Sequence, residues 1–298
     1  MRYSFVIVNW NTKDFVLEAV DSILRYMPKD RFDYEIILVD NASSDDSVAA
    51  FRSIITASIG AVIEVGYNRG FAGGANIGAR HAKGDYCVFF NSDAKFIDDS
   101  FLALDKYLCD FPEHLVGVRV VNMDSTLQDS AKGNFPTIKN AFQTFFLNGF
   151  KDGIYDDNDY AVSKSIDWVS GVFIAIKKDI FNKIGGFPER HFMYTEDMEM
   201  CFNAKENGYK VVYFPHTSLM HYRGGSMGKA SASLFLAPLT SLVNFHKEKI
   251  AKTRSEALCF LSITYSGYVW RIIKRACINK EYRNKVKHKI KRAVLWQK

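Results

Sequence analysis

The stretch Ser4-Phe5-Val6-Ile7-Val8-Asn9 decides the fold class, because it is a continuous apolar run that ends in a polar residue. A polar loop and an amphipathic segment over 15–26 follow it. This order predicts a strand, a loop and a helix. A strand that is apolar without alternation is buried on both faces, which is typical of a parallel sheet covered by helices.

The same pattern recurs along the next part of the chain. We expect strands over 34–39, 61–65 and 86–90, and helices over 48–55 and 75–82. The first 120 residues or so are therefore predicted to form a parallel α/β sheet with helices on both sides, an architecture of the Rossmann-like, nucleotide-binding type.

After Val121 the periodicity weakens. The segment 122–167 contains a Phe-rich stretch over 142–150 and an acidic loop over 152–159, and we interpret it as an insertion that covers one side of a ligand crevice. Regular patterns then return: strands are predicted over 168–176 and 209–214, and helices over 178–184 and 196–207.

The composition excludes several classes of protein. The 298 residues are 48% hydrophobic and 24% charged, which is enough to bury one large core or two modest ones. Five scattered cysteines without a C-x-x-C pair do not favour a disulfide framework or a zinc site. The apolar start is too short for a signal peptide, and no window reaches the roughly 18 apolar residues of a membrane span. We expect a cytoplasmic protein.

The C-terminal region carries the positive charge. Residues 247–298 contain fifteen of the 39 Lys and Arg but only three of the 33 Asp and Glu, and they include the uncharged run 257–270. One interpretation is an amphipathic helix in the interface of an anionic membrane. The alternative is a basic helix whose apolar side packs on the main domain. No recognised nucleic-acid-binding motif accompanies the charge, so nucleic acid is not expected as a partner.

Polar clusters follow four of the predicted strands. They are Asn9-Trp10-Asn11, Asp40-Asn41-Ala42-Ser43, Asn68-Arg69-Gly70 and Asn91-Ser92-Asp93. Each alone could be a loop rich in turn-forming residues. Because ligands of parallel sheets collect at the carboxyl ends of the strands, the four together predict a binding crevice.

Several common catalytic and phosphate-binding motifs are absent from the sequence. It has no G-x-G-x-x-G or H-E-x-x-H motif, and the stretch from Gly224 to Ala230 lacks the spacing of a P-loop. Simple dehydrogenases, P-loop NTPases and zinc proteases are thereby disfavoured.

Carboxylates remain as the candidates for chemistry. Asp93 ends an apolar strand, where it could hold Mg²⁺ or Mn²⁺ or could merely form a turn. Glu196 and Asp197 precede a predicted helix, where they could cap it or supply a general base.

Five motifs, in the order in which they occur along the chain, resemble the signature of family 2 glycosyltransferases with the GT-A fold. They are the segments 5–11, 39–45, 68–76, 90–93 and 195–197. The resemblance covers about residues 3–226, and the Asn-x-Asp form at 91–93 is most similar to the rhamnosyltransferase-type branch.

The resemblance implies a role for each matching residue. The nucleotide would be bound by Asn9, Asn11, Asp40, Asn68, Arg69, Gly70, Gly73, Gly74, Asn91 and Ser92. Asp40 would accept a hydrogen bond from the pyrimidine imide, and Arg69 would meet a phosphate. The metal, Mg²⁺ or Mn²⁺, would be held by Asp93 and His221. Asp197 would be the general base, with Glu196 beside it at the acceptor.

One position departs from the family pattern. Asn91 replaces the first acid of the D-x-D motif, so the metal loses a charged neighbour there. His216 and His221 are interpreted as loop residues rather than a zinc pair, since no further soft ligand is near in sequence.

We therefore predict an inverting glycosyltransferase. It would transfer a sugar, with rhamnose favoured, from a dTDP- or UDP-sugar to a hydroxyl of a bacterial cell-surface polysaccharide or a lipid-linked precursor. A weakly active binding or scaffold protein and a sugar nucleotidyltransferase are the alternatives. The expected domains are 1–229, divided into a nucleotide-binding half (1–121) and an acceptor-binding half (122–229), and a basic helical region over 230–298. We expect peripheral attachment to the inner face of the cell membrane through the C-terminal region, and a homo-oligomer is left open.

Overall fold

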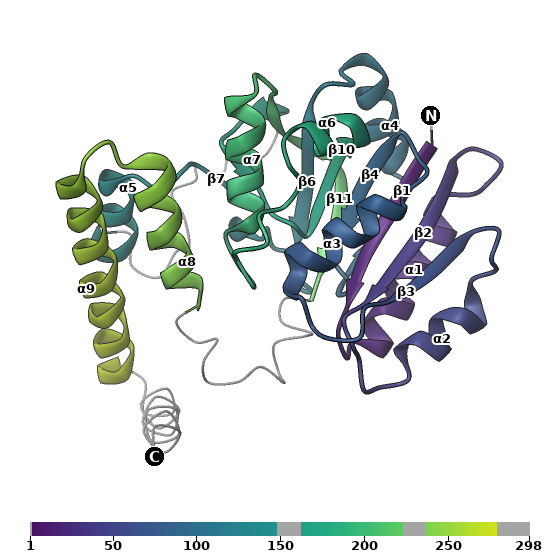
Figure 1. Ribbon diagram of the computed structural model, residues 1–298, viewed down its shortest axis with the longest axis horizontal. Helices are drawn as coiled ribbons and strands as arrows, with labels where there is room; N and C mark the ends of the chain where they lie inside the picture. Colours follow the sequence, from purple (N-terminus) through teal and green to yellow (C-terminus); the bar gives the residue numbers. More distant parts are fainter. Residues whose placement is uncertain (1, 148–161, 223–236, 279–298) are drawn as a thin grey trace. The chain divides into compact units, whose positions relative to one another are not determined.

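The computed structural model describes residues 2–147, 162–222 and 237–278 (Figure 1). The chain divides into two compact units. The first, here the sheet unit, contains Met1–Asn134 and Tyr155–Gly228. The second, here the helical unit, contains Phe135–Ile154 and Lys229–Lys298.

A large mixed sheet forms the centre of the sheet unit. Its strands are β1 (Arg2–Asn9), β2 (Asp33–Asp40), β3 (Gly60–Glu64), β4 (Tyr86–Phe90), β5 (Ala94–Phe96), β6 (Leu115–Val121), β8 (Lys164–Ser165), β10 (Phe173–Lys177) and β11 (Val211–His221). The order is β3-β2-β1-β4-β10-β6-β11-β5, with β8 beside β11. A separate small sheet pairs β7 (Lys132–Gly133) with β9 (Trp168–Val169).

Four pairs of neighbouring strands are parallel, as the sequence predicts for the first part of the chain: β1 with β2 and with β4, β2 with β3, and β6 with β11. Four pairs are antiparallel: β10 with β4 and with β6, and β11 with β5 and with β8. The sheet is therefore mixed, and β1, β2, β3 and β4 form a continuous parallel part.

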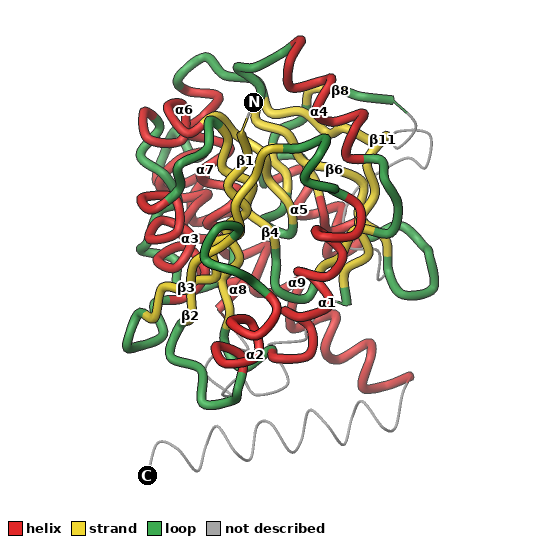
Figure 2. Tube along the Cα trace, turned by 90° about the vertical axis from the view of Figure 1, so that its right-hand side faces the viewer, coloured by secondary structure: helices red, strands yellow, loops and turns green. Residues whose placement is uncertain are grey.

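Helices cover both faces of this sheet. They are α1 (Lys13–Tyr26), α2 (Ser47–Ile54), α3 (Gly70–His81), α4 (Phe101–Asp110), α6 (Lys178–Lys183) and α7 (Glu196–Glu206). Figure 2 shows α3, α6 and α7 on one side of the yellow strands and α1 and α4 on the other. A short helical turn, Asp129–Ala131, lies before β7.

The alternating sides of β1 explain its continuous apolar sequence. Phe5 and Ile7 pack in one buried cluster with residues of α1 and α4. Val6 packs in the other cluster, with small residues of α3 such as Ala75 and Ala79. Both clusters consist of buried residues, so each face of the strand removes apolar surface from water.

The structure differs from the predicted elements at three places. The helix expected over 75–82 begins at Gly70, and the strand expected over 209–214 extends to His221. The single strand expected over 168–176 is two strands in different sheets, because the chain turns at Ser170–Val172. That turn becomes important for the site.

The helical unit is built from α5 (Ile138–Phe142), the wider helical turn Gln143–Leu147, α8 (Ala237–Phe245), the turn His246–Ile250 and α9 (Arg254–Ile278). Ala141, Val243 and Phe260 form its buried core. Within the described residues, no helix has the length and apolar character needed to cross a membrane.

The predicted boundaries differ from these units in one segment. The sequence places 135–154 in the acceptor-binding half, whereas it belongs to the same unit as the C-terminal region. The reason is packing: α5 and α9 share a core, and a Cβ on Gly267 would lie 2.4 Å from the Cβ of Phe145. The acidic loop over 152–159 lies outside the described residues.

Candidate active site

The candidate site lies at the carboxyl ends of β1, β2 and β4, which are neighbours in the sheet (Figure 1). Asn9 ends β1 and pairs in register with Asp40, which ends β2. Asn91 follows the last residue of β4. The parallel register therefore brings three of the four predicted polar clusters to one edge.

Asp40 is buried and held by two donors. Asn9 Nδ2 donates to its Oδ1 at 2.9 Å, and the Ser43 amide donates to its Oδ2 at 2.9 Å. Thr12 Oγ1 in turn donates to Asn9 Oδ1 at 2.6 Å. A carboxylate has about four acceptor positions, so Asp40 keeps capacity for a ligand N–H.

Asn11 organises the loop that follows β2. It adopts a left-handed backbone with φ 56°, and its Oδ1 accepts from the amides of Ser44 at 2.6 Å and Asp45 at 3.2 Å. Its own amide donates to Ser43 Oγ at 2.9 Å. Asn11 thus fixes the conformation of this loop, while its contact with a nucleoside stays a prediction.

The start of α3 lies beside this loop. Asn68 Oδ1 accepts from the Gly70 amide at 2.8 Å, and the Gly70 carbonyl accepts from Asn41 Nδ2 at 2.9 Å. The Arg69 guanidinium lies 4.7 Å from the ring centroid of Tyr67. Among the described residues, Arg69 Nε has no hydrogen-bond partner, which leaves this cation suited to an anionic ligand.

The glycines of α3 have a packing role. Gly70 has φ +71°, and a Cβ there would lie 2.0 Å from the Phe192 carbonyl oxygen. A Cβ on Gly73 would lie 2.7 Å from Arg69 Cβ, and one on Gly74 would lie 2.7 Å from Val8 Cγ1. They allow α3 to approach β1 and the segment before α7. Their predicted contact with phosphate stays a prediction.

Asp93 and His221 form the candidate metal centre. Both are buried, and Asp93 Oδ1 lies 3.1 Å from His221 Nε2. Asn91 Nδ2 lies 3.4 Å from the same nitrogen, and the Tyr222 amide donates to the Asp93 carbonyl at 2.9 Å. Thr12 Oγ1 lies 3.0 Å from Ser92 Oγ, which joins this loop to the Asp40 pocket.

The donor set fits a divalent cation that also binds a diphosphate. The described part of the chain holds no cluster of three or more His, Cys, Asp or Glu that could bind a metal by itself. One carboxylate oxygen and one imidazole nitrogen nevertheless face each other at the site. Mg²⁺ and Mn²⁺ bound through few protein ligands take the remaining oxygens from phosphate and water.

The candidate base lies at the start of α7, after a strained segment. Tyr194 and Thr195 both have left-handed backbones, with φ 72° and 74°. Such conformations cost about 1–3 kcal/mol and cluster at functional sites. Asp197 follows, and its Oδ2 accepts from the Gly171 amide at 2.9 Å and its Oδ1 from the Met198 amide at 2.7 Å.

Both carboxylates at the start of α7 have raised pKa values. Burial, followed by the charge of Asp197, raises the pKa of Glu196 well above its usual range. Burial also raises the pKa of Asp197, against the opposing effect of the Gly171 and Met198 amides. Glu196 Oε2 has no partner among the described residues. A raised pKa suits a group that takes a proton near neutral pH.

A two-residue turn joins the candidate base to the candidate metal centre. The Gly171 amide donates to Asp197, and the next carbonyl, of Val172, accepts from the Asn91 amide at 3.0 Å. This is the turn that splits the predicted strand over 168–176. It fixes Asp197 and the Asn91–Asp93 loop in one hydrogen-bonded framework.

Sequence reasoning missed several residues that hold this site together. Thr12, Ser43 and Gly171 make the contacts described above, and buried Glu199 accepts from Arg190 Nη2 at 2.5 Å beside His191 Nε2 at 2.7 Å. Glu199 lies in the same helical turn as Asp197. The three acids in the first turn of α7, Glu196, Asp197 and Glu199, were a signal that one of them could bind neighbouring residues and fix the position of the helix.

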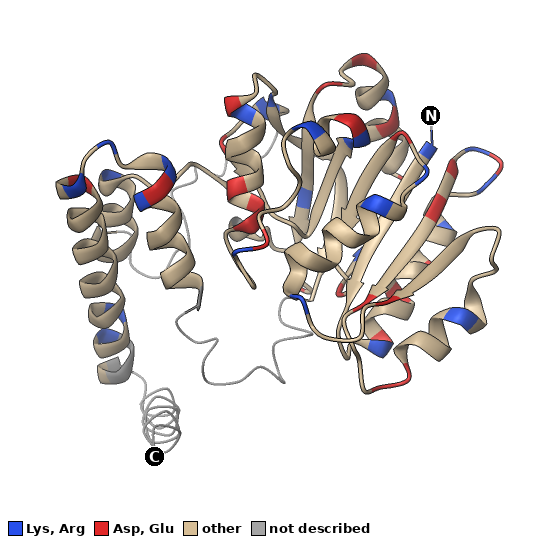
Figure 3. Cartoon of the chain, viewed as in Figure 1, with Lys and Arg blue, Asp and Glu red and all other residues tan. Residues whose placement is uncertain are grey.

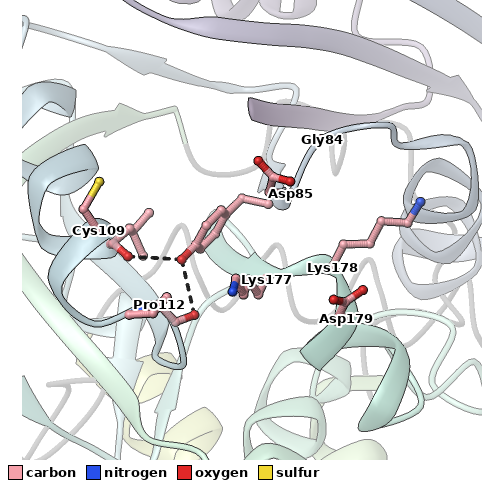
Figure 4. Close-up of a pocket in the computed structure, with 9 residues that line it drawn as sticks. Gly84, Asp85, Cys109, Pro112, Lys177, Lys178 and Asp179 are labelled. Atoms are coloured by element: carbon pink, nitrogen blue, oxygen red, sulfur yellow. Dashed lines mark hydrogen bonds between the residues drawn. The ribbon is translucent and has the colours of Figure 1, made fainter. Parts of the chain in front are cut away.

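A cavity lies away from this site. Its volume is about 490 Å³, and Figure 4 shows it around Gly84, Asp85, Cys109, Lys177 and Asp179. It is at the start of β4 and the end of antiparallel β10, the edge of the sheet opposite Asn91. No predicted site residue lines it.

Two segments named in the sequence analysis lie outside the described residues. They are the glycine-rich stretch within 223–230 and the end of the basic region, 279–298.

Comparisons with solved structures identify the fold. The mannosyltransferase PcManGT from Pyrobaculum calidifontis, in complex with GDP-Man and Mn²⁺, has a TM-score of 0.58 at 18% identity and covers 100% of this chain and 88% of its own. GalNAc-T7 with UDP, GalNAc and Mn²⁺ has a TM-score of 0.63 at 15% identity, over 83% of this chain and 48% of its own. The fold is therefore GT-A, as the sequence predicted.

Sequence comparisons give the family. Rhamnosyltransferase WbbL of Escherichia coli (strain K12) is 25% identical over 226 residues, 73% of this chain and 82% of the relative. An N-acetylglucosaminyl-diphospho-decaprenol L-rhamnosyltransferase of Mycobacterium tuberculosis (strain ATCC 25618 / H37Rv) is 33% identical over 70 residues, 24% of this chain and 23% of the relative. The model of Glycosyl transferase family 2 matches residues 4–185. The chain belongs to this family and is a glycosyltransferase.

Proposed function

We propose that this glycosyltransferase moves a sugar from a pyrimidine nucleotide, dTDP or UDP, to a hydroxyl of a bacterial surface polysaccharide or its lipid-linked precursor, with inversion at the anomeric carbon. Rhamnose is favoured because both relatives described above are named as rhamnosyltransferases. The observation that carries the proposal is the Gly171–Val172 turn, which ties the candidate base to the loop of the candidate metal centre.

The nucleoside is assigned to the pocket of Asp40. Asn9 and the Ser43 amide hold this carboxylate in one orientation, so it can accept from a pyrimidine imide N–H without reorganisation. The diphosphate then extends toward Arg69 and the start of α3, where the helix N-terminus favours negative charge.

Asp93 and His221 are assigned as the protein ligands of Mg²⁺ or Mn²⁺. When bound, the cation supplies positive charge that stabilises the departing diphosphate. Arg69 contributes a second positive group, at the start of α3. Because Asn91 replaces a carboxylate, we expect the metal to bind more weakly in the absence of nucleotide than in its presence.

Asp197 is assigned as the base of a single displacement. Its carboxylate removes the proton of the acceptor hydroxyl as the hydroxyl oxygen bonds to the anomeric carbon. The bond from that carbon to the diphosphate oxygen breaks with its electron pair on the diphosphate. The Gly171 and Met198 amides hold the carboxylate in position, and the protein needs no covalent intermediate.

Product formation from a donor panel tests this function. Purified protein is incubated with dTDP-rhamnose, UDP-glucose, UDP-galactose and UDP-N-acetylglucosamine, with an N-acetylglucosaminyl diphospholipid as acceptor and with Mn²⁺ or Mg²⁺. Transfer from dTDP-rhamnose is the expected result. Transfer from a UDP-sugar alone would replace the rhamnose assignment, and no transfer or sugar release from any donor would favour a binding or scaffold role.

We also propose that α9 places the enzyme on the inner face of the cell membrane, where lipid-linked acceptors lie. One side of α9, with Phe260 and Thr264, is buried in the helical unit. The opposite side exposes Leu258, Leu261 and Val269 by 56%, 40% and 53%. Figure 3 shows the middle of α9 in tan, since no charged residue occurs in 257–270. An apolar face flanked by cations suits an anionic interface.

Vesicle co-sedimentation tests the membrane assignment. Full-length protein carrying Leu258→Ser and Val269→Ser is expected to bind vesicles that contain phosphatidylglycerol much more weakly than the unmodified chain. Leu102→Ser is the matched control, because Leu102 is 54% exposed on α4 of the sheet unit. Equal binding by all three proteins would remove the membrane assignment and leave the glycosyl transfer untouched.

A further inference from the structure

Gln128 is a buried side chain without a role in any motif. It is 3% exposed and lies in the weakly patterned segment after β6. Its Oε1 lies 2.7 Å from Nδ1 of His221. Its Nε2 donates to Asn122 Oδ1 at 2.9 Å and to the His221 carbonyl at 3.3 Å. Gln128 therefore contacts the candidate metal ligand on the ring edge that faces away from Asp93.

The hydrogen bonds determine which way the Gln128 amide points. Asn122 Nδ2 donates to Thr126 Oγ1 at 2.9 Å and to the Leu127 carbonyl at 3.3 Å, so Asn122 Oδ1 is left as an acceptor. Gln128 must present its NH₂ to that oxygen and to the His221 carbonyl. Its Oε1 then faces His221, and an amide oxygen can only accept. His221 Nδ1 must carry the proton.

The opposite ring nitrogen, Nε2, faces the candidate metal site. It lies 3.1 Å from Asp93 Oδ1 and 3.4 Å from Asn91 Nδ2. Because Gln128 requires the proton on Nδ1, Nε2 is the nitrogen whose lone pair can bind a cation. A cation bound beside Asp93 would displace any proton on Nε2.

We infer that Gln128 is the positioning residue of the metal centre: it fixes the Nδ1–H tautomer of His221 and so directs the Nε2 lone pair, together with Asp93, at a divalent cation. This inference rests on the metal assignment of the proposed function and adds the residue that prepares the ligand. Partners that orient a metal-bound histidine typically change metal affinity 10- to 100-fold when removed.

The tautomer is measured first, on metal-free protein. Full-length protein labelled with ¹⁵N-histidine is examined by long-range ¹H–¹⁵N correlation at about pH 8.5, where an ordinary imidazole is neutral. The His221 signals are assigned by their loss in His221→Gln. The expected spectrum has a protonated Nδ1. An unprotonated Nδ1 in the unmodified protein would overturn the inference without any variant.

Variants of Gln128 then test the cause. Gln128→Leu is expected to mix the two tautomers and to weaken Mn²⁺ binding 10- to 100-fold, as followed by electron paramagnetic resonance. Gln128→Glu keeps an oxygen opposite Nδ1 and should retain the tautomer and most of the affinity. Gln143→Leu, the same change in the helical unit, is the matched control. Unchanged tautomer and Mn²⁺ affinity in folded Gln128→Leu would overturn the inference.

The readouts separate this inference from the proposed function. Binding of UDP or dTDP in the presence of EDTA should be the same in Gln128→Leu and the unmodified protein, because Gln128 contacts the ligand of the metal and not the Asp40 pocket. If Gln128→Leu loses nucleotide binding as well as metal binding, Gln128 has a general structural role and the inference is overturned. Absence of sugar transfer with the tautomer effect intact would count against the proposed function alone.

Discussion

Glu196 lies beside Asp197 at the start of α7, and the burial of Glu196 can be measured as a pH dependence of the free energy of unfolding. Glu196 is buried with an unpartnered Oε2, and its pKa is raised well above the usual range by burial and by Asp197. The folded protein therefore keeps this proton to a higher pH than the unfolded chain does. The free energy of unfolding must fall as pH rises from the ordinary glutamate pKa through the raised one.

Glu196→Gln should remove this pH dependence, because an amide does not ionise. We expect the variant to lose less stability than the unmodified protein between about pH 5 and pH 8, as measured by urea unfolding at each pH. The exposed Glu206→Gln, at the other end of the same helix, is the control. Parallel pH profiles for Glu196→Gln and the unmodified protein would contradict a raised pKa at Glu196.

Asp40 is the residue whose removal should most directly weaken nucleotide binding. A hydrogen bond to a charged group contributes about 1.5–3 kcal/mol, so Asp40→Ala should reduce the affinity for dTDP or UDP at least about tenfold by titration calorimetry. Asp46→Ala is the matched control, since Asp46 is an exposed carboxylate of the same loop that pairs with Lys13. Unchanged affinity in Asp40→Ala would move the nucleoside out of this pocket.

At the scale of elements, α3 packs closely against the sheet because Gly78, on its inner face, has no side chain. A Cβ on Gly78 would lie 2.3 Å from Val6 Cγ1 and 3.0 Å from Val39 Cγ2. In an exposed helix, glycine to alanine stabilises by up to about 1 kcal/mol. Here the sign should reverse, and Gly78→Ala should cost about 1–3 kcal/mol in urea unfolding. The exposed Arg80→Ala is the control, and a stabilised Gly78→Ala would contradict the close packing.

The elements that the sequence predicted well are those whose structure is determined by residues close together in the chain. The strand at Ser4–Asn9 and its successors are continuous apolar runs ended by polar residues, so their type and approximate bounds follow from the pattern. The insertion of β10 between β4 and β6 has no such local cause, because it depends on residues about 60 to 90 positions apart. The turn at Gly171 was hidden inside an apolar run for the same reason.

The site shows the same division. Asp40, Asp93 and Asp197 could be named as candidates from the sequence because each is a carboxylate placed where an apolar strand ends or a helix begins. Gln128 could not, since its signals are burial and hydrogen bonds to residues 6 and 93 positions away. Residues that react have distinctive types and positions, whereas residues that hold them are defined by tertiary contacts.

At the scale of the whole molecule, ligand binding should stabilise the sheet unit. A ligand at a hundred times its dissociation constant adds about 2.7 kcal/mol to the free energy of unfolding. We expect dTDP with Mn²⁺ to raise Tm more than UDP, GDP, CDP or ADP, and to raise it less when EDTA replaces the metal. Asp93→Asn should lose the metal-dependent part. A response to GDP or ADP alone would contradict the pyrimidine assignment.

The central claim is that Asp197 deprotonates the acceptor, and one comparison tests it most directly. Single-turnover transfer from the donor that the panel identifies is measured for the unmodified protein and for Asp197→Asn, together with nucleotide affinity for both. The account predicts that Asp197→Asn binds nucleotide normally and loses transfer by at least about a hundredfold, the effect of a general base. Transfer at an undiminished rate by Asp197→Asn would contradict it.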